Sequence, residues 1–341
     1  IVSFLKADRQ EENELFHRSA TLKQAYVGNN VYLRGLIELS NICEKDCYYC
    51  GIRCSNRQVH RYRLTHEEVM STLLFAHEKG FGSVAIQSGE RSSPTFVRQI
   101  DKILRDAKKV TGGEIGITLS CGEQTKETYR RWFESGAARY LLRIESSSEK
   151  LYGKLHPADE KHSYGRRIGA LEALKETGYQ TGTGVMIGLP FQTVEELADD
   201  LLFMQQMDID MCGMGPYIEH AATPLWEERH QLLPLNERLR LSLRMIALLR
   251  ILMPDINIAA TTALQAIEKE GREKAIRIGA NVLMPNITPA RYRDAYLLYE
   301  NKPLTARNDE EDERLQAIGH RIGYHHKGNS PRYKKRTGRE Q

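Results

Sequence analysis

Two adjoining segments decide how this sequence is read: the apolar segment Val31-Tyr-Leu-Arg-Gly-Leu-Ile-Glu-Leu-Ser40, and the cysteine loop after it, Cys43-Glu-Lys-Asp-Cys47-Tyr-Tyr-Cys50. The apolar segment predicts a β-strand. The cysteine loop places three thiols within eight residues, and a loop this short can turn three thiolates toward one point. Structural zinc sites and ordinary iron-sulfur clusters use four protein ligands, so a set of three leaves one coordination position open. If the metal is a [4Fe-4S] cluster, its fourth iron can bind a substrate or a cofactor.

Strand-like and helix-like segments alternate along the rest of the chain. Strands are expected at Val31–Ser40, Ser83–Gly89, Glu114–Ser120, Arg139–Glu145, Thr181–Leu189, Asp210–Tyr217, Ile256–Ala263 and Asn281–Asn286. Helices are expected at about 11–27, from 65 onward, and at 94–109, 125–135, 164–177, 193–207, 235–252 and 269–278. Thr65-His-Glu-Glu68 and Thr193-Val-Glu-Glu196 have the spacing of a capping box, which marks the start of a helix.

The alternation predicts a (β/α)8 TIM-type barrel with an N-terminal helix and a C-terminal extension. An open doubly wound sheet gives the same local rhythm, and a six-stranded open barrel with an accessory region is a second alternative. We favour the closed barrel, with the cysteine loop at its C-terminal mouth. The expected division is 1–30 as a helical lead-in, 31–300 as the barrel and 301–341 as a charged extension. Tyr292, Tyr296 and Tyr299 belong to a polar stretch that folds under or over the barrel. The last residues, including Arg332, Lys334, Lys335, Arg336 and Arg339, are expected to form a solvated or frayed tail.

Composition excludes several functional classes. The most apolar stretch, Leu239 to Met253, is interrupted by three arginines, so no membrane span is expected. The net charge of +4 is mild, and we see no folded basic face interleaved with aromatics, so no nucleic-acid partner is expected. Half of the six cysteines lie in one loop, which favours a metal site in a reducing compartment over disulfides. We expect a cytoplasmic protein; the sequence does not begin with Met, so import into an organelle stays an open alternative.

Polar side chains at the ends of the predicted strands are the candidates for chemistry, because barrel enzymes build their sites there. Two methionines accompany them. The candidates are Gln87, Ser88, Gly89, Glu90, Thr118, Ser120, Arg143, Glu145, Met211, Thr261, Thr262, Met284 and Asn286. Arg143 and Glu145 are two residues apart on a predicted strand, so both point the same way and can face the lumen. The alternatives are a structural salt bridge for these two, ordinary strand residues for the threonines, and core filler for the methionines.

The cysteine loop resembles the signature of the radical S-adenosylmethionine (SAM) superfamily, with Tyr49 before the last cysteine. The turn Ser88-Gly89-Glu90 matches the one that touches the SAM amino group in that superfamily. The resemblance narrows to one branch, the HydE-type maturases of [FeFe]-hydrogenase, over about 26–299. The runs that carry it are 84–90, 140–145, 187–190, 213–216, 260–263 and 279–286. Methylornithine synthase and biotin synthase are related branches.

This resemblance implies a role for individual residues. Cys43, Cys47 and Cys50 would ligate one [4Fe-4S] cluster, and its open iron would bind SAM. The residues expected around SAM are Tyr49, Gly89, Glu90, Ser120, Glu145 and Arg167, with Arg166 as the alternative to Arg167. Arg143, Thr261 and Thr262 would hold the amino-acid part of the substrate. The same cavity would be lined by Gln87, Thr118, Met211, Ile218, Met284, Tyr296 and Tyr299.

The resemblance also implies partners and chemistry. Reductive cleavage of SAM would give a 5′-deoxyadenosyl radical. That radical would act on a small iron-carbonyl-cyanide-cysteine complex, with Arg143 clamping the carboxylate. Other hydrogenase maturases and a one-electron donor are the expected protein partners. The chain has no cysteine after Cys212, so a second protein-ligated cluster of the C-terminal type is not expected. His156 stands where other members carry Arg, and Cys54, Cys121 and Cys212 are expected to be small buried hydrophobic residues.

Two other functions stay open. The first keeps radical SAM chemistry and changes the substrate, as in a methylornithine synthase or another amino-acid mutase. The second is a non-enzymatic assembly protein in which the cysteine loop binds zinc, with His60 as the fourth ligand.

Overall fold

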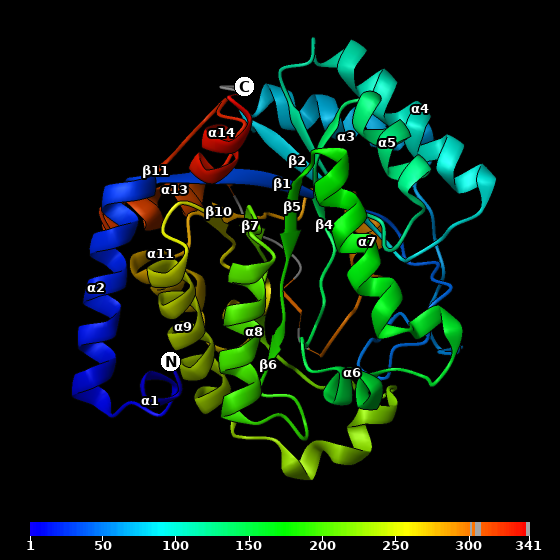
Figure 1. Ribbon diagram of the computed structural model, residues 1–341. Helices are drawn as coiled ribbons and strands as arrows, with labels where there is room; N and C mark the ends of the chain where they lie inside the picture. Colours follow the sequence, from blue (N-terminus) through cyan, green and yellow to red (C-terminus); the bar gives the residue numbers. More distant parts are fainter. Residues whose placement is uncertain (301, 304–307, 339–341) are drawn as a thin grey trace.

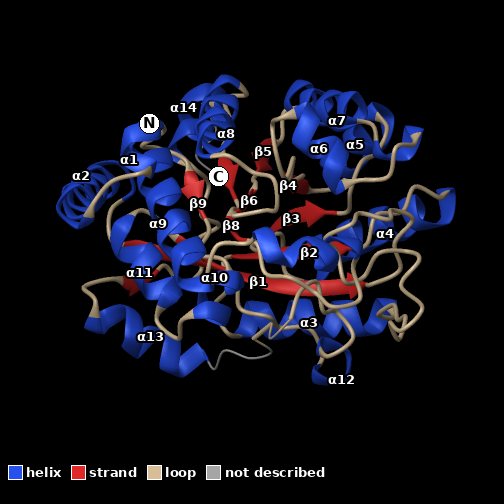
Figure 2. Ribbon diagram, turned by 90° about the horizontal axis from the view of Figure 1, so that it is seen from below, coloured by secondary structure: helices blue, strands red, loops and turns tan. Residues whose placement is uncertain are grey.

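The computed structural model describes residues 1–300, 302–303 and 308–338, and among these, eight parallel strands surround a central core. Figure 1 shows the strands with their helices, and Figure 2 shows that the helices lie outside the strands. The strands are β1 (Asn30–Ser40), β2 (Ser83–Ser88), β3 (Gly116–Ser120), β4 (Ala137–Leu141), β5 (Gln180–Thr183), β7 (Met211–Cys212), β9 (Asn257–Ile258) and β10 (Val282–Leu283). Their spatial order follows the chain, as in a singly wound barrel.

Hydrogen bonds close this sheet into a ring. Strand β10 pairs in parallel with β1, where Tyr32 faces Val282. On its other side, the Asn281 N–H donates to the Ile258 carbonyl and the Ala260 N–H to the Val282 carbonyl, each at 2.9 Å. The predicted closed barrel is therefore confirmed over the open-sheet alternatives.

The helices between the strands are α3 (His66–Glu78), α4 (Pro94–Val110), α5 (Lys126–Glu134), α7 (Tyr164–Thr177), α8 (Val194–Gln206), α9 (Leu235–Leu252) and α11 (Gly271–Ile278). Both predicted capping boxes are present. The Thr65 side chain accepts the Glu68 N–H while the Glu68 carboxylate accepts the Thr65 N–H, and Thr193 and Glu196 repeat the pattern. These exchanges satisfy amide groups that a helix start otherwise leaves without partners.

Several strands stop pairing sooner than the sequence suggested. The predicted strand 181–189 divides into β5 and β6 (Met186–Ile187), and 210–217 divides into β7 and β8 (Gly215–Pro216); β6 pairs with β8 in a separate small sheet. The predicted strand 256–263 is shorter in the structure: β9 ends at Ile258, Ala259 adds one isolated bridge to Val282, and α10 (Thr262–Ile267) begins at Thr262. The chain between these short pieces carries polar residues over the barrel mouth.

Further short elements complete the described chain. They are α1 (Val2–Leu5), α6 (Glu149–Leu155), the 3-10 helices at Glu160–His162 and Pro224–Gln231, α12 (Ala290–Arg293), α13 (Asn308–Ala317), β11 (Arg321–Ile322) and α14 (Pro331–Thr337). The helical lead-in includes α2 (Arg9–Val27), which packs against α9: the Glu12 carboxylate lies 2.8 Å from the Arg244 guanidinium.

The C-terminal residues pack under the barrel, so the prediction of a frayed tail was wrong for the described part of it. Arg139 and Gln180, both buried, donate to the Asn329 side chain at 2.7 Å. Asn257 donates to the Gly328 carbonyl at 2.8 Å. Arg332 and Arg336 form ion pairs with aspartates beneath the barrel, at 2.9 Å to Asp255 and 2.6 Å to Asp210 respectively. Arg339 lies outside the described residues, as do residues 301 and 304–307 of the predicted extension.

The polar stretch before residue 300 folds over the opposite, C-terminal mouth. The ring of Tyr292 stacks on Tyr62 with centroids 4.8 Å apart. Tyr299 and Thr262 share a hydrogen bond of 2.8 Å, and Lys302 pairs with the buried carboxylate of Glu38. The barrel is thus closed at one end by residues 327–336 and covered at the other by residues 287–300 and 302–303.

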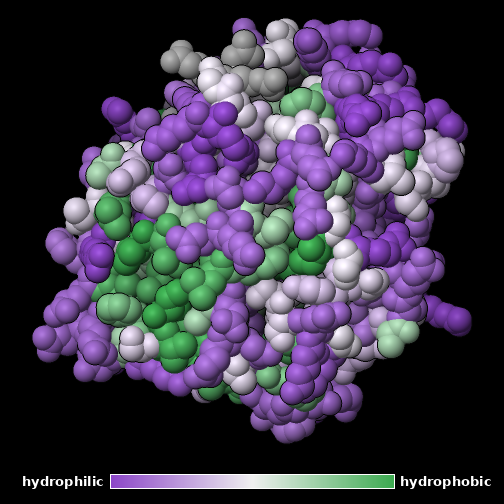
Figure 3. Space-filling model, in the orientation of Figure 1, coloured by the Kyte–Doolittle hydropathy of each residue, from purple (hydrophilic) through white to green (hydrophobic). Residues whose placement is uncertain are grey.

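The surface is uneven in polarity. Figure 3 shows an apolar area on the left of the molecule, over α1, α8 and α9. Its exposed side chains include Phe4, Leu202 and Leu235. None of the described helices combines the length and the hydropathy needed to cross a membrane.

The packing of the C-terminal segment yields a prediction. Tyr333 in α14 is 3% exposed, and its hydroxyl donates to the Gly178 carbonyl. We expect Tyr333→Ala to lower the free energy of unfolding by about 3–5 kcal/mol, as for other buried aromatics. Lys335→Ala, which removes an exposed ion pair with Asp255, should cost less than about 1 kcal/mol. Urea denaturation of both variants measures this; equal stabilities would show that α14 does not support the barrel.

Candidate functional site

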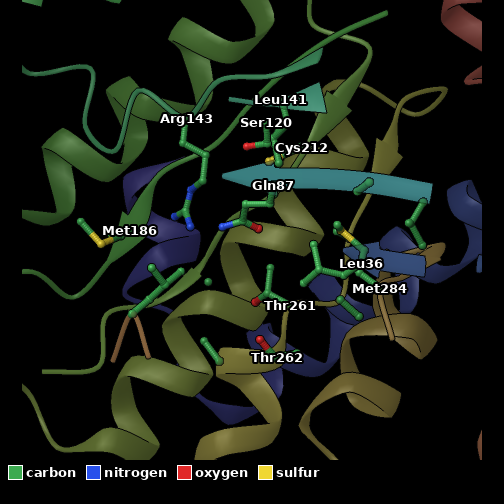
Figure 4. A pocket seen from close by; sticks show the side chains of 18 of the residues that line it. Leu36, Gln87, Ser120, Leu141, Arg143, Met186, Cys212, Thr261, Thr262 and Met284 are labelled. Carbon is green, nitrogen blue, oxygen red and sulfur yellow. The ribbon is translucent and has the colours of Figure 1, made fainter. Parts of the chain in front are cut away.

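A cavity of about 240 Å³ lies inside the barrel at its C-terminal mouth. Its volume is near the lower end of the usual range for small-molecule sites, about 300–1,000 Å³. Thirteen predicted residues line it: Tyr49, Cys50, Gln87, Thr118, Ser120, Arg143, Glu145, Met211, Ile218, Thr261, Thr262, Met284 and Tyr299. In Figure 4 the Arg143 side chain points into the cavity beside Gln87, and the two threonines lie across from it.

The cysteine loop forms one edge of this cavity. Backbone hydrogen bonds hold it to surrounding segments: Glu44 N–H donates to the Glu90 carbonyl at 2.9 Å and Tyr48 N–H to the Leu155 carbonyl at 2.9 Å. The Asp46 N–H donates to the His162 ring at 2.8 Å. Cys50 lines the cavity, whereas Cys47 is buried behind it. The loop is therefore a fixed part of the mouth.

The three thiols have the character of ligands to a cluster. Burial, and after it the neighbouring Cys43, raises the pKa of the Cys47 thiol to about 12. Buried thiolates need a cationic partner such as iron, whereas the Cys43 sulfur accepts a hydrogen bond from the backbone N–H of Lys45 at 3.4 Å. Among the described residues, no three Cys, His, Asp or Glu side chains converge as ligands to a single ion do. A [4Fe-4S] cluster does not require that convergence, because each thiolate binds a different iron. The side chain of His60, the fourth ligand in the zinc alternative, is exposed.

The turn after β2 approaches the cysteine loop closely. A Cβ atom on Gly89 would lie 2.4 Å from the Ile42 carbonyl oxygen and 2.9 Å from the Cys43 Cβ, so only glycine fits. Glu90, next in the chain, does not line the cavity. Its carboxylate lies 3.1 Å from the Lys45 ammonium and 3.7 Å from the Arg167 guanidinium.

Glu90 belongs to a buried ionic cluster with Lys45, Glu123 and Arg167. The Glu123 carboxylate lies 3.0 Å from Lys45 and 2.6 Å from Arg167, and the pKa of Glu123 is lowered by Arg167 first and then Lys45, against the opposing effect of burial. Sequence reasoning missed Glu123. A signal was present, since Gly122-Glu123 after β3 repeats Gly89-Glu90 after β2.

Arg167 is committed to this cluster in the structure. It also donates to the Arg143 carbonyl at 2.6 Å, and it does not line the cavity. Arg166 is exposed on the outer side of α7, so the choice between the two falls on Arg167. Contact of Gly89, Glu90 or Arg167 with SAM stays a prediction.

Arg143 and Glu145 both face the cavity, although β4 ends before them at Leu141. Their side chains lie 3.0 Å apart, so the predicted salt-bridge alternative is present. Arg143 also donates to the Val185 carbonyl at 2.8 Å. Glu145 adopts a left-handed backbone with φ of +67°, an unfavourable conformation for a residue with a side chain. Such strain persists only where neighbouring contacts hold it.

Unsatisfied polar atoms point to a polar ligand. The Thr118 hydroxyl, the Tyr217 hydroxyl and Nε of Arg143 are buried without a hydrogen-bond partner among the described residues. All three residues line the cavity. A buried polar group without a partner is costly, so these atoms fit a ligand that carries both donors and acceptors.

Two predicted aromatic residues have different outcomes. Tyr49 lines the cavity, and its hydroxyl lies 3.3 Å from Nε2 of His156. Burial lowers the pKa of His156 to about 3, and its Nδ1–H donates to the Tyr152 carbonyl, so Nε2 accepts the bond from Tyr49. Tyr296 does not line the cavity, contrary to the prediction: it is 1% exposed and its ring packs against Lys302.

The burial predicted for the other three cysteines is found for two of them. Cys121 and Cys212 are buried as predicted, and Cys212 touches the cavity wall. Cys54 is exposed, so the prediction of a buried residue was wrong there.

Comparisons with known proteins agree with the resemblance seen in the sequence. The Radical SAM superfamily profile matches residues 37–204. The chain is 44% identical over 296 residues to "[FeFe] hydrogenase maturase subunit HydE" of Thermotoga maritima, covering 86% of this chain and 81% of that protein. It is 29% identical over 285 residues to "3-methylornithine synthase" of Methanosarcina acetivorans, covering 82% and 77% of the two chains. The crystal structure of methylornithine synthase (PylB) superposes with a TM-score of 0.79 at 24% identity, covering 95% and 93%, which shows the shared fold.

The Asp200 carboxylate, which binds the backbone two residues after Glu145, yields a prediction about how stability depends on pH. The buried Asp200 carboxylate accepts the Ser147 N–H and hydroxyl, both at 2.6 Å, and burial raises its pKa to about 7. Between the ordinary pKa of 3.8 and the folded-state pKa of about 7, Asp200 keeps a proton in the folded state that it has lost in the unfolded state. The free energy of unfolding therefore falls as the pH rises through this range. The slope expected from this group is about 1.4 kcal/mol per pH unit.

Asp200→Asn keeps an oxygen for the Ser147 bonds and does not ionise. We expect the variant to lose this component of the pH dependence between about pH 4 and 7, measured by urea denaturation at several pH values. Asp199→Asn, at an exposed neighbouring position, is the matched control. An unchanged profile in Asp200→Asn would contradict the assignment.

Proposed function

The chain belongs to the radical SAM superfamily and, within it, to the family of [FeFe] hydrogenase maturase HydE, and we propose that it acts as such a maturase on a small iron-cysteine precursor. The observation that carries the proposal is the similarity to the Thermotoga maturase, which extends through most of the barrel. The cavity gives further support, because its lining brings together Cys50 of the cysteine loop, Arg143 and the pair Thr261 and Thr262.

The family implies a [4Fe-4S] cluster and SAM, and the thiols fit the cluster. In our proposal Cys43, Cys47 and Cys50 hold it. When bound, the reduced cluster would supply the electron for cleavage of a SAM C–S bond, which gives methionine and a 5′-deoxyadenosyl radical. Tyr49, held by His156, and Glu145, held in its strained conformation, would bound the nucleoside part of SAM beside Cys50.

Such a radical attacks almost any nearby bond, so the protein must exclude water and hold the target close. Residues 287–300 cover the mouth, and apolar side chains such as Leu36, Met186 and Met284 fill the wall between the polar groups. Arg143 would bind a substrate carboxylate through its unpartnered Nε, while the Thr261 and Thr262 hydroxyls receive the amino-acid portion from across the cavity.

The substrate class follows from these groups. An iron-carbonyl-cyanide-cysteine complex presents a carboxylate to Arg143 and a sulfur toward the radical. A second candidate is a lysine-to-methylornithine mutase, favoured by the similarity to 3-methylornithine synthase. Lysine also presents a carboxylate, so the cavity alone does not separate the two.

The thiol assignments make a direct prediction. After anaerobic reconstitution and dithionite reduction, we expect the protein to convert SAM to 5′-deoxyadenosine, and Cys50→Ala to lose this activity by at least about a hundredfold, as expected when a reaction loses a required group. Cys54→Ala, four residues along and exposed, should retain it. Chromatographic quantification of 5′-deoxyadenosine measures the difference. Equal rates in the Cys50 variant and the parent would rule out the proposed ligand set.

Two assays of the parent protein distinguish between the two candidate substrates. We expect the parent to restore hydrogenase activity in a maturation mixture lacking HydE and to produce no methylornithine from lysine. Methylornithine production without maturation would replace the proposed function with the mutase.

Arg143 gives a second prediction about the substrate. Arg143→Gln should raise the precursor concentration needed for half-maximal maturation by at least about tenfold, since a hydrogen bond to a charged group contributes about 1.5–3 kcal/mol. SAM cleavage without precursor should stay within a few-fold. Arg166→Gln, on the outer side of the same region, is the control. A precursor response like that of the parent would remove Arg143 from the substrate site.

A further inference from the structure

A basic segment follows the cysteine loop directly. Residues 51–63 contain Arg53, Arg57, Arg61 and Arg63 together with His60, and they contain no aspartate or glutamate. Arg57, His60 and Arg63 are exposed. We call Arg57, His60 and Arg63 the basic face.

The segment is folded around the guanidinium of Arg61. That group donates to the carbonyls of Asn41 at 2.6 Å, Ile52 at 2.8 Å and Arg53 at 2.6 Å. The Asn56 side chain donates to the Gly51 carbonyl at 2.7 Å, and the Cys54 N–H to the Lys45 carbonyl at 2.9 Å. These bonds hold the basic face in a fixed position against the cysteine loop.

The positive charge of this face is largely uncompensated. Arg53 pairs with Asp46 at 2.8 Å. No carboxylate lies within 4.0 Å of Arg57, Arg61 or Arg63 among the described residues. Glu44, the exposed acid of the cysteine loop, accepts a hydrogen bond from the Ser92 hydroxyl. The two exposed guanidinium groups, those of Arg57 and Arg63, therefore remain available to an external partner.

The two sides of the cysteine loop differ in access. On one side Tyr49 and Cys50 line the cavity, which residues 287–300 cover. On the other side residues 51–63 reach the protein surface; they belong to the blue loops at the right of Figure 1, a part of the surface that is mainly hydrophilic in Figure 3. The rate of electron transfer between proteins falls steeply with distance, so a donor reaches the cysteine loop best from its solvent side.

We propose that the basic face is the docking surface for an acidic protein that carries one electron at a time, and that this carrier reduces the site held by Cys43, Cys47 and Cys50. The inference rests on the proposed function. One electron leaves the reduced carrier, which is oxidised by one electron, and the cluster site gains it; no bond forms between the two proteins. Charge complementarity selects the partner, since uncompensated arginines accelerate association with acidic proteins and repel basic ones.

The test uses a reduced acidic flavodoxin, regenerated by its reductase and NADPH, as the probe. At low ionic strength and subsaturating flavodoxin, the variant Arg57→Glu/Arg63→Glu should form 5′-deoxyadenosine at least about tenfold more slowly than the parent, the lower end of the effect of electrostatic steering. With dithionite, which needs no docking surface, both should react within about twofold. Arg18→Glu, exposed on α2 at the opposite side of the molecule, should behave as the parent in both assays.

Two results would overturn the proposal. One is flavodoxin-driven cleavage by the double variant at the parental rate. The other is an equal loss with flavodoxin and with dithionite, which would make the arginines structural.

Direct binding separates this proposal from the proposed function. Titration of flavodoxin should show affinity that falls with added salt in the parent and is weakened in the double variant. If neither protein cleaves SAM even with dithionite, the proposed function fails while the binding result still decides the docking surface. Binding to flavodoxin that is equal in parent and double variant excludes that surface.

Discussion

The buried ionic cluster of Lys45, Glu90, Glu123 and Arg167 is the interaction on which the site depends. Its four side chains are each less than 15% exposed, and its formal charges sum to zero. They come from the cysteine loop, from the segments after β2 and β3, and from α7. Removing one member would leave a buried charge without a partner, a change that commonly costs about 3–5 kcal/mol. The cluster therefore fixes the loop relative to three separate parts of the barrel.

The fixed position of the cysteine loop explains why a thiol and a guanidinium group line the same cavity. Strands β4, β5, β7 and β9 stop pairing before the mouth, and the chain beyond them carries Arg143, Glu145 and the threonine pair. The cysteine loop meets these residues from the side of β1. Cys50 of the cysteine loop and the Arg143 side chain thus line one cavity, while the basic face outside the loop stays open to solvent.

Local signals in the sequence predicted much of this arrangement. The capping residues Thr65 and Thr193 marked helix starts, and the spacing of the cysteines identified the loop. Patterns with a period of two indicated that Arg143 and Glu145 share a face, but they did not show where pairing ends, because pairing depends on the neighbouring strand. Glu123 and residues 327–336 acquire their roles only through contacts distant in the sequence, such as the bond between Gln180 and Asn329. Tyr296 was misplaced for the same reason, since its contact with Lys302 decides which way the ring faces.

We propose that SAM and the amino-acid part of the substrate lie side by side in one cavity, where Glu145 and Arg143 adjoin. A crystal structure of the anaerobically reconstituted protein with SAM and cysteine tests it most directly. The account predicts SAM between Tyr49 and Glu145, joined to the cluster, and the cysteine carboxylate within hydrogen-bond distance of Arg143. Cysteine bound outside the cavity, or SAM placed away from the cysteine loop, would contradict it.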